Sequence, residues 1–429
     1  MRKILGIFCC LLVGKLQGQD LKLWYDRPGE KWEETLPLGN GLIGMMPNGS
    51  INDESIVLNE ISMWSGSPQD ANNYNAKSSV LDIQRLLFEG KNDEAEALVN
   101  KNFVCVGAGS GQGDGANVPY GSFQNFGFMN FLFFHEGETK DYKRWLDISN
   151  ATAGTSFTNN GTKFLRLSAD KKKSIEFAMH FYREENIEEY KVNGNEITIS
   201  GSLPDGKGGK GIQFAAKFKV LTKGGTLMDH DNEIIVKGAN EAIVLFSAST
   251  SYYGHDPKEV VSTEIKKVEK MNFSALKQSH HRKYKPLFER VSLAITDSLS
   301  KSDIPTDKRL SAFYNDPGQD NGLATLYYQF GRYLTLSSSA PSVSKALPPN
   351  LQGLWAHQIQ TPWNGDYHLN INAQMNHWGV EVNNLSEYHK PFIEMIKNIS
   401  KEGVKTAKAY YDAPGWVVYM MSNIWGYTA

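Results

Sequence analysis

Short runs of alternating apolar and polar residues fill the first part of the chain, from residue 21 to about 260. The clearest run, GIQFAAKFKVLT at 211–222, has apolar residues at every second position from Ile212 to Val220. In an extended segment this spacing places those side chains on one face, which can pack against a core. Similar runs at 195–203 and 241–250 are separated by turns rich in Gly and Asn. The pattern predicts an N-terminal antiparallel β-sandwich domain over residues 20–260.

Apolar residues three and four positions apart indicate helices elsewhere in the chain. One such pattern interrupts the β region at 76–100 and breaks at Gly90. Helical spacing becomes the rule after about residue 260, and we expect linker helices over 261–305 and a helical domain over 306–429. The last helix is expected to run from a capping residue near Ser386 to about residue 407. The apolar residues that define a helix in the middle of this region are Leu323, Leu326, Phe330, Tyr333 and Leu334.

The stretch YHLNINAQMNHW at 367–378 alternates strictly from His368 to Asn376. Its polar positions are His368, Asn370, Asn372, Gln374 and Asn376, and its apolar positions are Leu369, Ile371, Ala373 and Met375. A period of two predicts an extended segment with an imidazole and a row of amides on one face. Asn is a poor strand former, so local propensity does not explain these residues. A ligand that the amides would hold does explain them.

Aromatic residues are interleaved with these amides. Trp355, Trp363 and Trp378 lie close together in the sequence, and a second cluster, NEISMWSG at 59–66, contains Trp64. A sugar ring stacks its apolar face on an aromatic ring, and its hydroxyls need both donors and acceptors, which Asn and Gln supply. Each tryptophan alone is explained equally well by a core position. The combination favours a saccharide-binding site.

Composition and charge restrict the classes of partner. The chain has 429 residues, of which 40% are hydrophobic and 21% charged, and its formal net charge is −2. A chain of this length and balance is globular and long enough for more than one domain. Its charge gives no reason to expect nucleic acid or an anionic membrane as a partner, and no apolar run after residue 20 is long enough to span a bilayer.

The N-terminus is typical of an exported protein. Residues 1–18 combine a basic start, an apolar run and a small residue, Gly18, where cleavage is expected. We therefore expect a signal peptide and a periplasmic or secreted protein. A lipoprotein anchor at Cys9 or Cys10 is disfavoured because the residues before them do not form a lipobox.

The remaining candidates for metal and phosphate sites have simpler explanations. Cys105 is the only cysteine after the signal, so neither an internal disulfide nor a multi-cysteine metal site is expected. The histidines show no metal-binding spacing, and we predict no metal or other cofactor. The glycine run at 107–122 lacks the Lys-Ser/Thr ending of a phosphate loop, so a flexible surface loop is favoured.

Several long motifs resemble glycoside hydrolase family 95, the inverting α-L-fucosidases, which include some α-L-galactosidases. The motifs that carry the resemblance are LWYDRPGEKWEETLPLGNGLIGMM, ESIVLNEISMWSG, PYGSFQNFG, YKRWLDISNATAG, LPPNLQGLWAHQIQTPWNGDYHLNINAQMNHWGVEVNNLSE and GWVVYMMSNIWGYTA. They cover nearly the whole mature chain in order. The resemblance implies an N-terminal β-supersandwich, a helical linker and an (α/α)6 barrel that holds the active site.

The resemblance also implies roles for individual residues. Asn370 and Asn372 correspond to the pair that positions and activates the attacking water, and His368 to a sugar-binding neighbour. With the tryptophans, the expected substrate-binding residues are His368, Trp64, Trp355 and Trp378. The implied substrate is a fucosylated oligosaccharide or glycan with a terminal 1,2-linked α-L-fucose. Inversion requires an acid opposite the water, and the family's acid and its helper carboxylate lie further downstream than Ala429.

The expectation is therefore the N-terminal part of a longer enzyme, with an incomplete barrel over 306–429. Alternatives are an α-L-galactosidase of the same family and a non-catalytic glycan-binding remnant. Asp366 is a further candidate, as a direct base, if the extended segment reaches it. Glu381 is expected to be a buried partner of a helix or loop.

Overall fold

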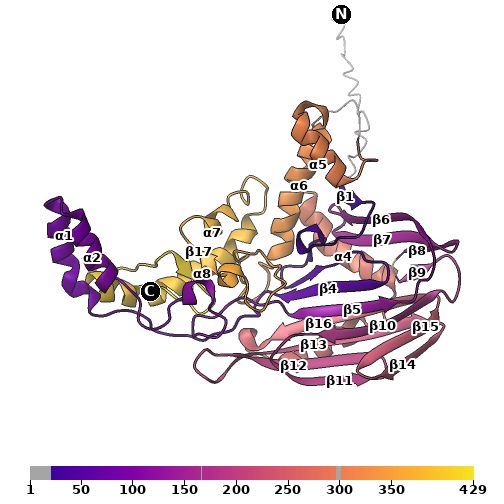
Figure 1. Ribbon diagram of the computed structural model, residues 1–429, viewed down its shortest axis with the longest axis horizontal. Helices are drawn as coiled ribbons and strands as arrows, with labels where there is room; N and C mark the ends of the chain where they lie inside the picture. The colour runs from indigo at the N-terminus through magenta and orange to yellow at the C-terminus, as the bar shows by residue number, and fades with distance from the viewer. Residues whose placement is uncertain (1–20, 166, 296–300) are drawn as a thin grey trace, which may run out of the picture.

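The computed structural model describes residues 21–165, 167–295 and 301–429, and β structure precedes helices along the chain (Figure 1). Antiparallel strands dominate up to Thr250, and helices dominate from Pro257 onward. The expected signal peptide at 1–18 lies outside the described residues. Within the described ranges, no helix is both long and apolar enough to cross a bilayer.

Two large sheets form the N-terminal part, and their neighbouring strands are antiparallel. The nine-stranded sheet has, in spatial order, β1 (Lys22–Tyr25), β6 (Thr139–Asp147), β7 (Thr152–Asn159), β8 (Thr162–Leu165), β9 (Ser168–Ala169), β16 (Glu241–Thr250), β13 (Lys210–Lys223), β12 (Glu196–Pro204) and β11 (Ile187–Asn193). The seven-stranded sheet has β14 (Thr226–His230), β15 (Glu233–Ala239), β10 (Ile175–Tyr182), β5 (Gly127–Phe133), β4 (Asp53–Glu60), β3 (Ile43–Met46) and β2 (Leu38–Gly39).

The core of this part lies between the two sheets. The alternating residues of 211–222 form β13, and Phe214 and Phe218 are fully buried there. They share one apolar cluster with Phe177 of β10 and Val236 of β15, which belong to the other sheet. The apolar residues at every second position from Ile212 to Val220 are buried, so the predicted alternation is confirmed for this strand. Such a pattern is typical of a strand whose one face packs on a core.

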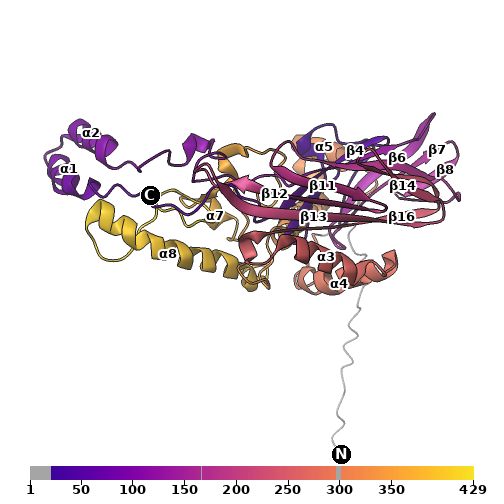
Figure 2. The same ribbon diagram turned by 90° about the horizontal axis from the view of Figure 1, so that it is seen from below.

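The helices are α1 (Val80–Phe88), α2 (Asn92–Asn102), α3 (Pro257–Val268), α4 (Phe273–Phe288), α5 (Thr306–Asn315), α6 (Asn321–Ser338), α7 (Asn372–Met375) and α8 (Lys390–Tyr411). The side chain of Asp256 caps α3 by accepting a hydrogen bond from the backbone N–H of Lys258 at 2.8 Å. Helix α3 packs along β13 and β16, on the outer face of the nine-stranded sheet (Figure 2). Helix α3, at the start of the expected linker region, is thus packed on the β part.

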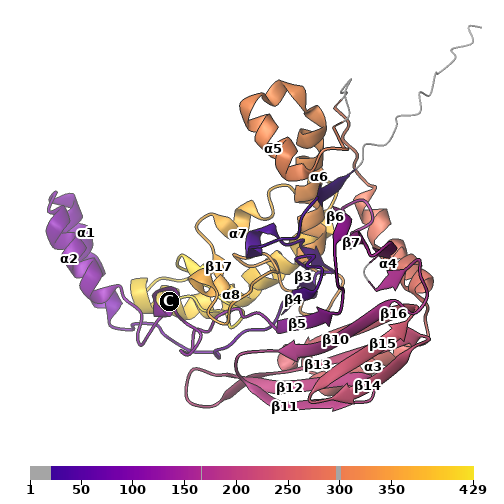
Figure 3. The same cartoon turned by 45° about the vertical axis from the view of Figure 1, so that its right-hand side comes forward.

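Three of the predicted helices are observed. The pattern at 76–100 forms α1 and α2, which separate at Gly90, where φ is +73°. This hairpin lies at the opposite end of the molecule from the sheets and beside the C-terminal end of α8 (Figure 3). The apolar residues of 323–334 lie in α6. The last predicted helix corresponds to α8, but it begins at Lys390 with Pro391 in its first turn, so the prediction of Ser386 as its cap is wrong.

Candidate active site

The segment that precedes the asparagines is a short strand rather than a long one. Strand β17 (Tyr367–His368) pairs antiparallel with β18 (Met421–Ser422), and the N–H of Leu369 donates to the carbonyl of Met420 at 2.7 Å. The backbone leaves the extended conformation at Ile371, and α7 begins at Asn372. The prediction of one extended segment from His368 to Asn376 is therefore wrong after Leu369.

The change of backbone rearranges the predicted faces. Successive residues of a helix turn by about 100° rather than 180°, so the polar positions no longer share one side. Ile371 and Met375 are exposed instead of anchored in a core. Asn370 is exposed and Asn372 is half-buried. Neither amide is enclosed by protein, and both lie within a few residues of His368.

His368 is held by a buried carboxylate. Its Nδ1 lies 2.6 Å from Oδ1 of Asp366, whose side chain is only 1% exposed. Oδ2 of Asp366 accepts a hydrogen bond from the hydroxyl of Tyr120 at 2.7 Å. Burial raises the pKa of Asp366 to about 6, although the contacts with Tyr120 and His368 act in the opposite direction. Because neither carboxylate oxygen faces solvent, the role of Asp366 as a direct base that contacts the attacking water is not supported. Glu381, expected to be buried, is exposed and accepts a hydrogen bond from Ser386.

The glycine-rich loop at 107–122 packs against the segment before β17. The N–H of Gly115 donates to Oδ1 of Asn364 at 2.6 Å, and Nδ2 of Asn364 donates to the carbonyl of Ser110 at 2.8 Å. Gly121 has φ +79°, and a Cβ there would lie 2.0 Å from the carbonyl oxygen of Ser65. The prediction of a surface loop is wrong for residues 120–122, which are buried, whereas Gly107 and Ala108 are exposed. Gly121 instead allows the backbone of the loop to approach the backbone of Ser65 closely.

Trp64 does not reach the surface. It is 0% exposed, its ring stacks on Tyr367 with centroids 5.8 Å apart, and it also contacts Phe123. A direct contact between Trp64 and a sugar is excluded by this burial. Trp64 supports Tyr367, the neighbour of His368, from within an apolar cluster. We therefore correct its predicted role from substrate binding to packing beneath the site.

The other tryptophans differ in exposure. Trp355 is half-buried, and its Nε1 donates to the carbonyl of Leu38 at 2.9 Å, whereas Trp378 is 64% exposed. Trp363 belongs to the aromatic group in the sequence but was given no specific role there. It is 62% exposed, and its ring is perpendicular to that of His368, with the ring centroids 6.3 Å apart. Its φ of +56° places it in a left-handed turn. The only signal for this turn in the sequence is the Asn-Gly pair that follows Trp363.

Glu60, from the same NEISMWSG cluster, is also buried. Oε2 of Glu60 accepts hydrogen bonds from the backbone N–H and the hydroxyl of Ser62, at 2.9 and 2.7 Å. Burial raises the pKa of Glu60 to about 7 from its usual value of 4.5, although the bonds from Ser62 lower it. The carboxyl group of the folded chain therefore binds a proton more tightly than that of the unfolded chain.

This difference predicts a stability that depends on pH. Between pH 4.5 and about pH 7 the folded state holds the Glu60 proton and the unfolded state does not, so stability falls as pH rises through this range. The loss attributable to this group is on the order of 3 kcal/mol. Glu60→Gln, which keeps the shape of the protonated carboxyl, should flatten this part of the profile. Denaturant unfolding at a series of pH values measures it, with the exposed Glu138→Gln as the control. Parallel profiles for wild type and Glu60→Gln would contradict the assignment.

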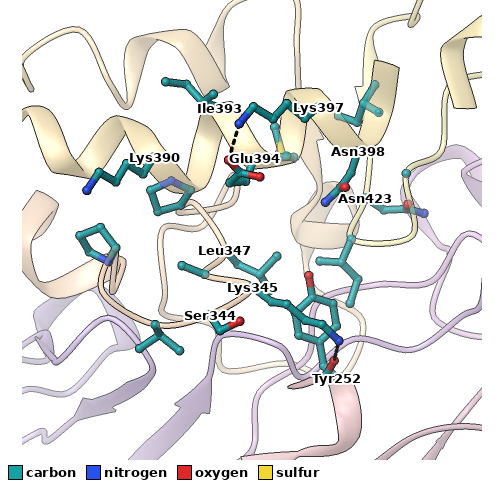
Figure 4. Close-up of a pocket in the computed structure, with 18 residues that line it drawn as sticks. Tyr252, Ser344, Lys345, Leu347, Lys390, Ile393, Glu394, Lys397, Asn398 and Asn423 are labelled. Atoms are coloured by element: carbon teal, nitrogen blue, oxygen red, sulfur yellow. Dashed lines mark hydrogen bonds and ion pairs between the residues drawn. The ribbon is translucent and has the colours of Figure 1, made fainter. Parts of the chain in front are cut away.

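A cavity of about 840 Å³ lies nearby but does not include these residues. Figure 4 shows that α8 contributes Lys390, Glu394 and Lys397 to its lining, and that Tyr252 and Lys345 close the other side. Nζ of Lys397 pairs with Glu394 at 2.6 Å. His368, Asn370 and Asn372 do not line this cavity. The candidate site is thus the open surface around the end of β17 and the start of α7.

The chain matches two family models. Residues 272–429 match the model described as glycosyl hydrolase family 95 catalytic domain. Residues 23–255 match the model described as glycosyl hydrolase family 65, N-terminal domain. All the candidate residues on β17 and α7 fall in the first of these matches, and Tyr120 falls in the second.

Two curated relatives are named as fucosidases, and one solved structure shares the fold. The chain is 31% identical to Alpha-L-fucosidase 2 of Arabidopsis thaliana, over 96% of this chain and 53% of that protein. It is 29% identical to Probable alpha-fucosidase A of Aspergillus niger, over 95% of this chain and 54% of that protein. The structure of a putative kojibiose phosphorylase from human microbiome superposes with a TM-score of 0.53 at 11% identity, over 94% of this chain and 51% of that chain. The last likeness concerns the fold alone. The chain spans about half the length of the curated relatives it matches.

Proposed function

Since this chain belongs to glycoside hydrolase family 95, we propose that the protein hydrolyses terminal 1,2-linked α-L-fucose from oligosaccharides or glycans with inversion of configuration. The observation that carries the proposal is the grouping of His368, Asn370 and Asn372 at the end of β17, inside the match to the family's catalytic domain. The relatives' names as fucosidases supply the substrate class. The activity is proposed for the whole protein, because the chain spans about half of those relatives.

In this proposal Asn370 and Asn372 hold the attacking water. An inverting enzyme must place a water on the face of the sugar opposite the leaving group, with a proton acceptor beside it. An amide is too weak a base to take the proton alone. Its carbonyl oxygen can nevertheless accept a hydrogen bond from the water, and two amides can fix its direction. A carboxylate that polarises the pair completes the base, and an acid must protonate the leaving oxygen. We assign neither role to Asp366, whose buried carboxylate accepts a hydrogen bond from Tyr120 and lies against Nδ1 of His368.

His368, Trp355 and Trp378 are proposed to bind the sugar, and no metal or other cofactor takes part. Exposed Trp378 and half-buried Trp355 offer apolar faces, and the ring of His368 can hydrogen-bond a hydroxyl through its Nε2. The wider architecture proposed is a β-supersandwich joined by linker helices to an (α/α)6 barrel.

The proposal is tested by the products formed from 2′-fucosyllactose. Proton NMR during the reaction should show L-fucose appearing first as the β-anomer, because a single displacement inverts the α-linkage. The α-anomer as the first product would refute inversion. Faster cleavage of the matched α-L-galactoside would move the substrate class to galactosides. Binding of the fucoside without cleavage would identify the protein as a glycan-binding module.

His368→Ala should raise KM and have a smaller effect on kcat. A group that holds a sugar hydroxyl in both the ground state and the transition state contributes uniform binding, and its loss weakens substrate affinity. Steady-state kinetics with 2′-fucosyllactose measures both constants. His180→Ala is the control, because His180 lies on β10 of the β part and pairs with Glu233. An unchanged KM in His368→Ala would remove His368 from the binding site.

A further inference from the structure

The imidazole of His368 is fixed in direction by its surroundings. Its backbone is paired with Met421 through the β17–β18 ladder, and its ring meets the edge of Trp363. Nδ1 is turned toward the protein interior, where it lies 2.6 Å from Oδ1 of Asp366. Only Nε2 remains for a ligand.

Asp366 in turn is held by a group from the β part. Tyr120 is fully buried, and its hydroxyl lies 2.7 Å from Oδ2 of Asp366 and 3.2 Å from the carbonyl of Ser422. The shorter contact is the one to a carboxylate, which forms the stronger hydrogen bond. Burial and the neighbouring carboxylate raise the pKa of Tyr120 well above its usual range, so the phenol keeps its proton. The tyrosine hydroxyl is therefore the donor, and Asp366 is the acceptor.

A carboxylate that faces Nδ1 determines which nitrogen of a neutral imidazole carries the proton. The group that faces a ring nitrogen decides whether this nitrogen carries the proton or the lone pair. An ionised carboxylate 2.6 Å from Nδ1 attracts a proton on that nitrogen and repels a lone pair there, so it stabilises N–H at Nδ1. Nε2 then has a free lone pair and acts as an acceptor.

We propose that Asp366 is a positioning residue that holds His368 as the Nδ1–H tautomer, so that Nε2 accepts a hydrogen bond from a hydroxyl of the bound sugar. The ligand part of this inference rests on the proposed function, and the tautomer does not. The inference adds a requirement on the substrate: the group that meets His368 must be a hydroxyl that donates. A sugar whose hydroxyl is methylated at that position has no proton to give and would lose this contact.

The tautomer can be measured on the 429-residue chain without substrate. Histidine labelled with ¹⁵N gives distinct two-bond ¹H–¹⁵N patterns for the two tautomers, and the spectra are recorded at alkaline pH. The signal of His368 is identified by its loss in His368→Gln. The wild type should show Nδ1–H. An Nε2–H pattern in the wild type would overturn the proposal by itself, whatever the variants do.

Two variants distinguish the effect of the Asp366 carboxylate on the tautomer from that of the Tyr120 hydroxyl. Asp366→Asn keeps the shape but can turn either its oxygen or its NH₂ toward Nδ1, so the single tautomer should become a mixture. Tyr120→Phe removes the neighbouring hydroxyl and leaves the Nδ1 contact in place, so Nδ1–H should persist. Unchanged signals from the other histidines show that each variant is folded. A folded Asp366→Asn that retains only Nδ1–H would overturn the proposal.

Kinetics then tests the ligand part. Measured on the whole protein with 2′-fucosyllactose, Asp366→Asn should raise KM several-fold in the same direction as His368→Ala, with a smaller change in kcat. A tautomer change with an unchanged KM would overturn the role in sugar binding. If the whole wild-type protein does not cleave the fucoside, the proposed function fails, and the NMR result on the 429-residue chain still decides the tautomer.

Discussion

Replacing either Asn370 or Asn372 with alanine is expected to reduce kcat by about two to four orders of magnitude while KM changes little. The amides are proposed to hold the water rather than the sugar, so their loss falls on the chemical step. Loss of a positioned proton-transfer partner has this magnitude in enzymes generally. Steady-state kinetics of the active protein with 2′-fucosyllactose measures the effect.

The double variant tests whether the two amides hold the same water. If both amides orient the same water, removing either one already leaves the water without a fixed position. The kcat of the double variant should then be little lower than that of each single variant. Asn376→Ala is the matched control, because Asn376 is an exposed asparagine just after α7 and should behave as wild type. A double variant that loses the product of the single losses would argue against a shared water. A kcat near that of wild type in either single variant would remove that residue from the catalytic site.

Trp64→Ala is expected to destabilise the fold by about 3–5 kcal/mol, the usual cost of removing a large buried aromatic side chain. Trp64 is 0% exposed and packs between Tyr367 and Phe123, so truncation leaves a cavity directly beneath β17. The prediction separates packing from sugar contact. A packing residue lowers the free energy of unfolding, whereas a sugar-contacting residue at the surface changes KM and leaves stability unchanged.

Denaturant unfolding of Trp64→Ala should be compared with that of Trp378→Ala. Trp378 is 64% exposed, so its removal should change stability by no more than about 0.5 kcal/mol. Trp64→Phe, which retains part of the ring volume, should fall between the two. Equal stability of the two alanine variants would mean that Trp64 is not packed as described.

The periodic parts of the chain were predictable because burial on one face is a local property of the sequence. The run at 211–222 formed β13, and the spacing at 323–334 formed α6, in each case with the apolar residues against a core. The region at 367–378 alternates just as regularly, but its backbone is extended only at its start and becomes helical from Asn372. The low strand propensity of Asn was the better guide there, since α7 begins at Asn372.

The support of His368 could be predicted only in part. Asp366 and His368 are two positions apart, so an extended segment that reaches Asp366 places both side chains on one side. From the sequence, Asp366 was considered only as a direct base, not as a partner of His368. Tyr120 is 246 positions away from Asp366. No local pattern indicates that contact, which depends on tertiary packing rather than on propensity. The left-handed turn at Trp363 has the following Asn-Gly pair as a local signal, and the glycine-rich loop stabilises it through Asn364.

The backbone around β17 is tied to distant parts of the chain, and this has a consequence for biosynthesis. Tyr120 receives a hydrogen bond at its carbonyl from Asn423, 303 positions away, and β17 has no partner strand until β18 has been made. Contacts of such separation are slow to close, and the N-terminal domain folds first as a chain leaves the ribosome. We therefore expect the surroundings of His368 to become ordered only after residue 423 has emerged. On a nascent chain, binding of a fucoside would then report that the β17–β18 pairing has formed rather than that the motif is present.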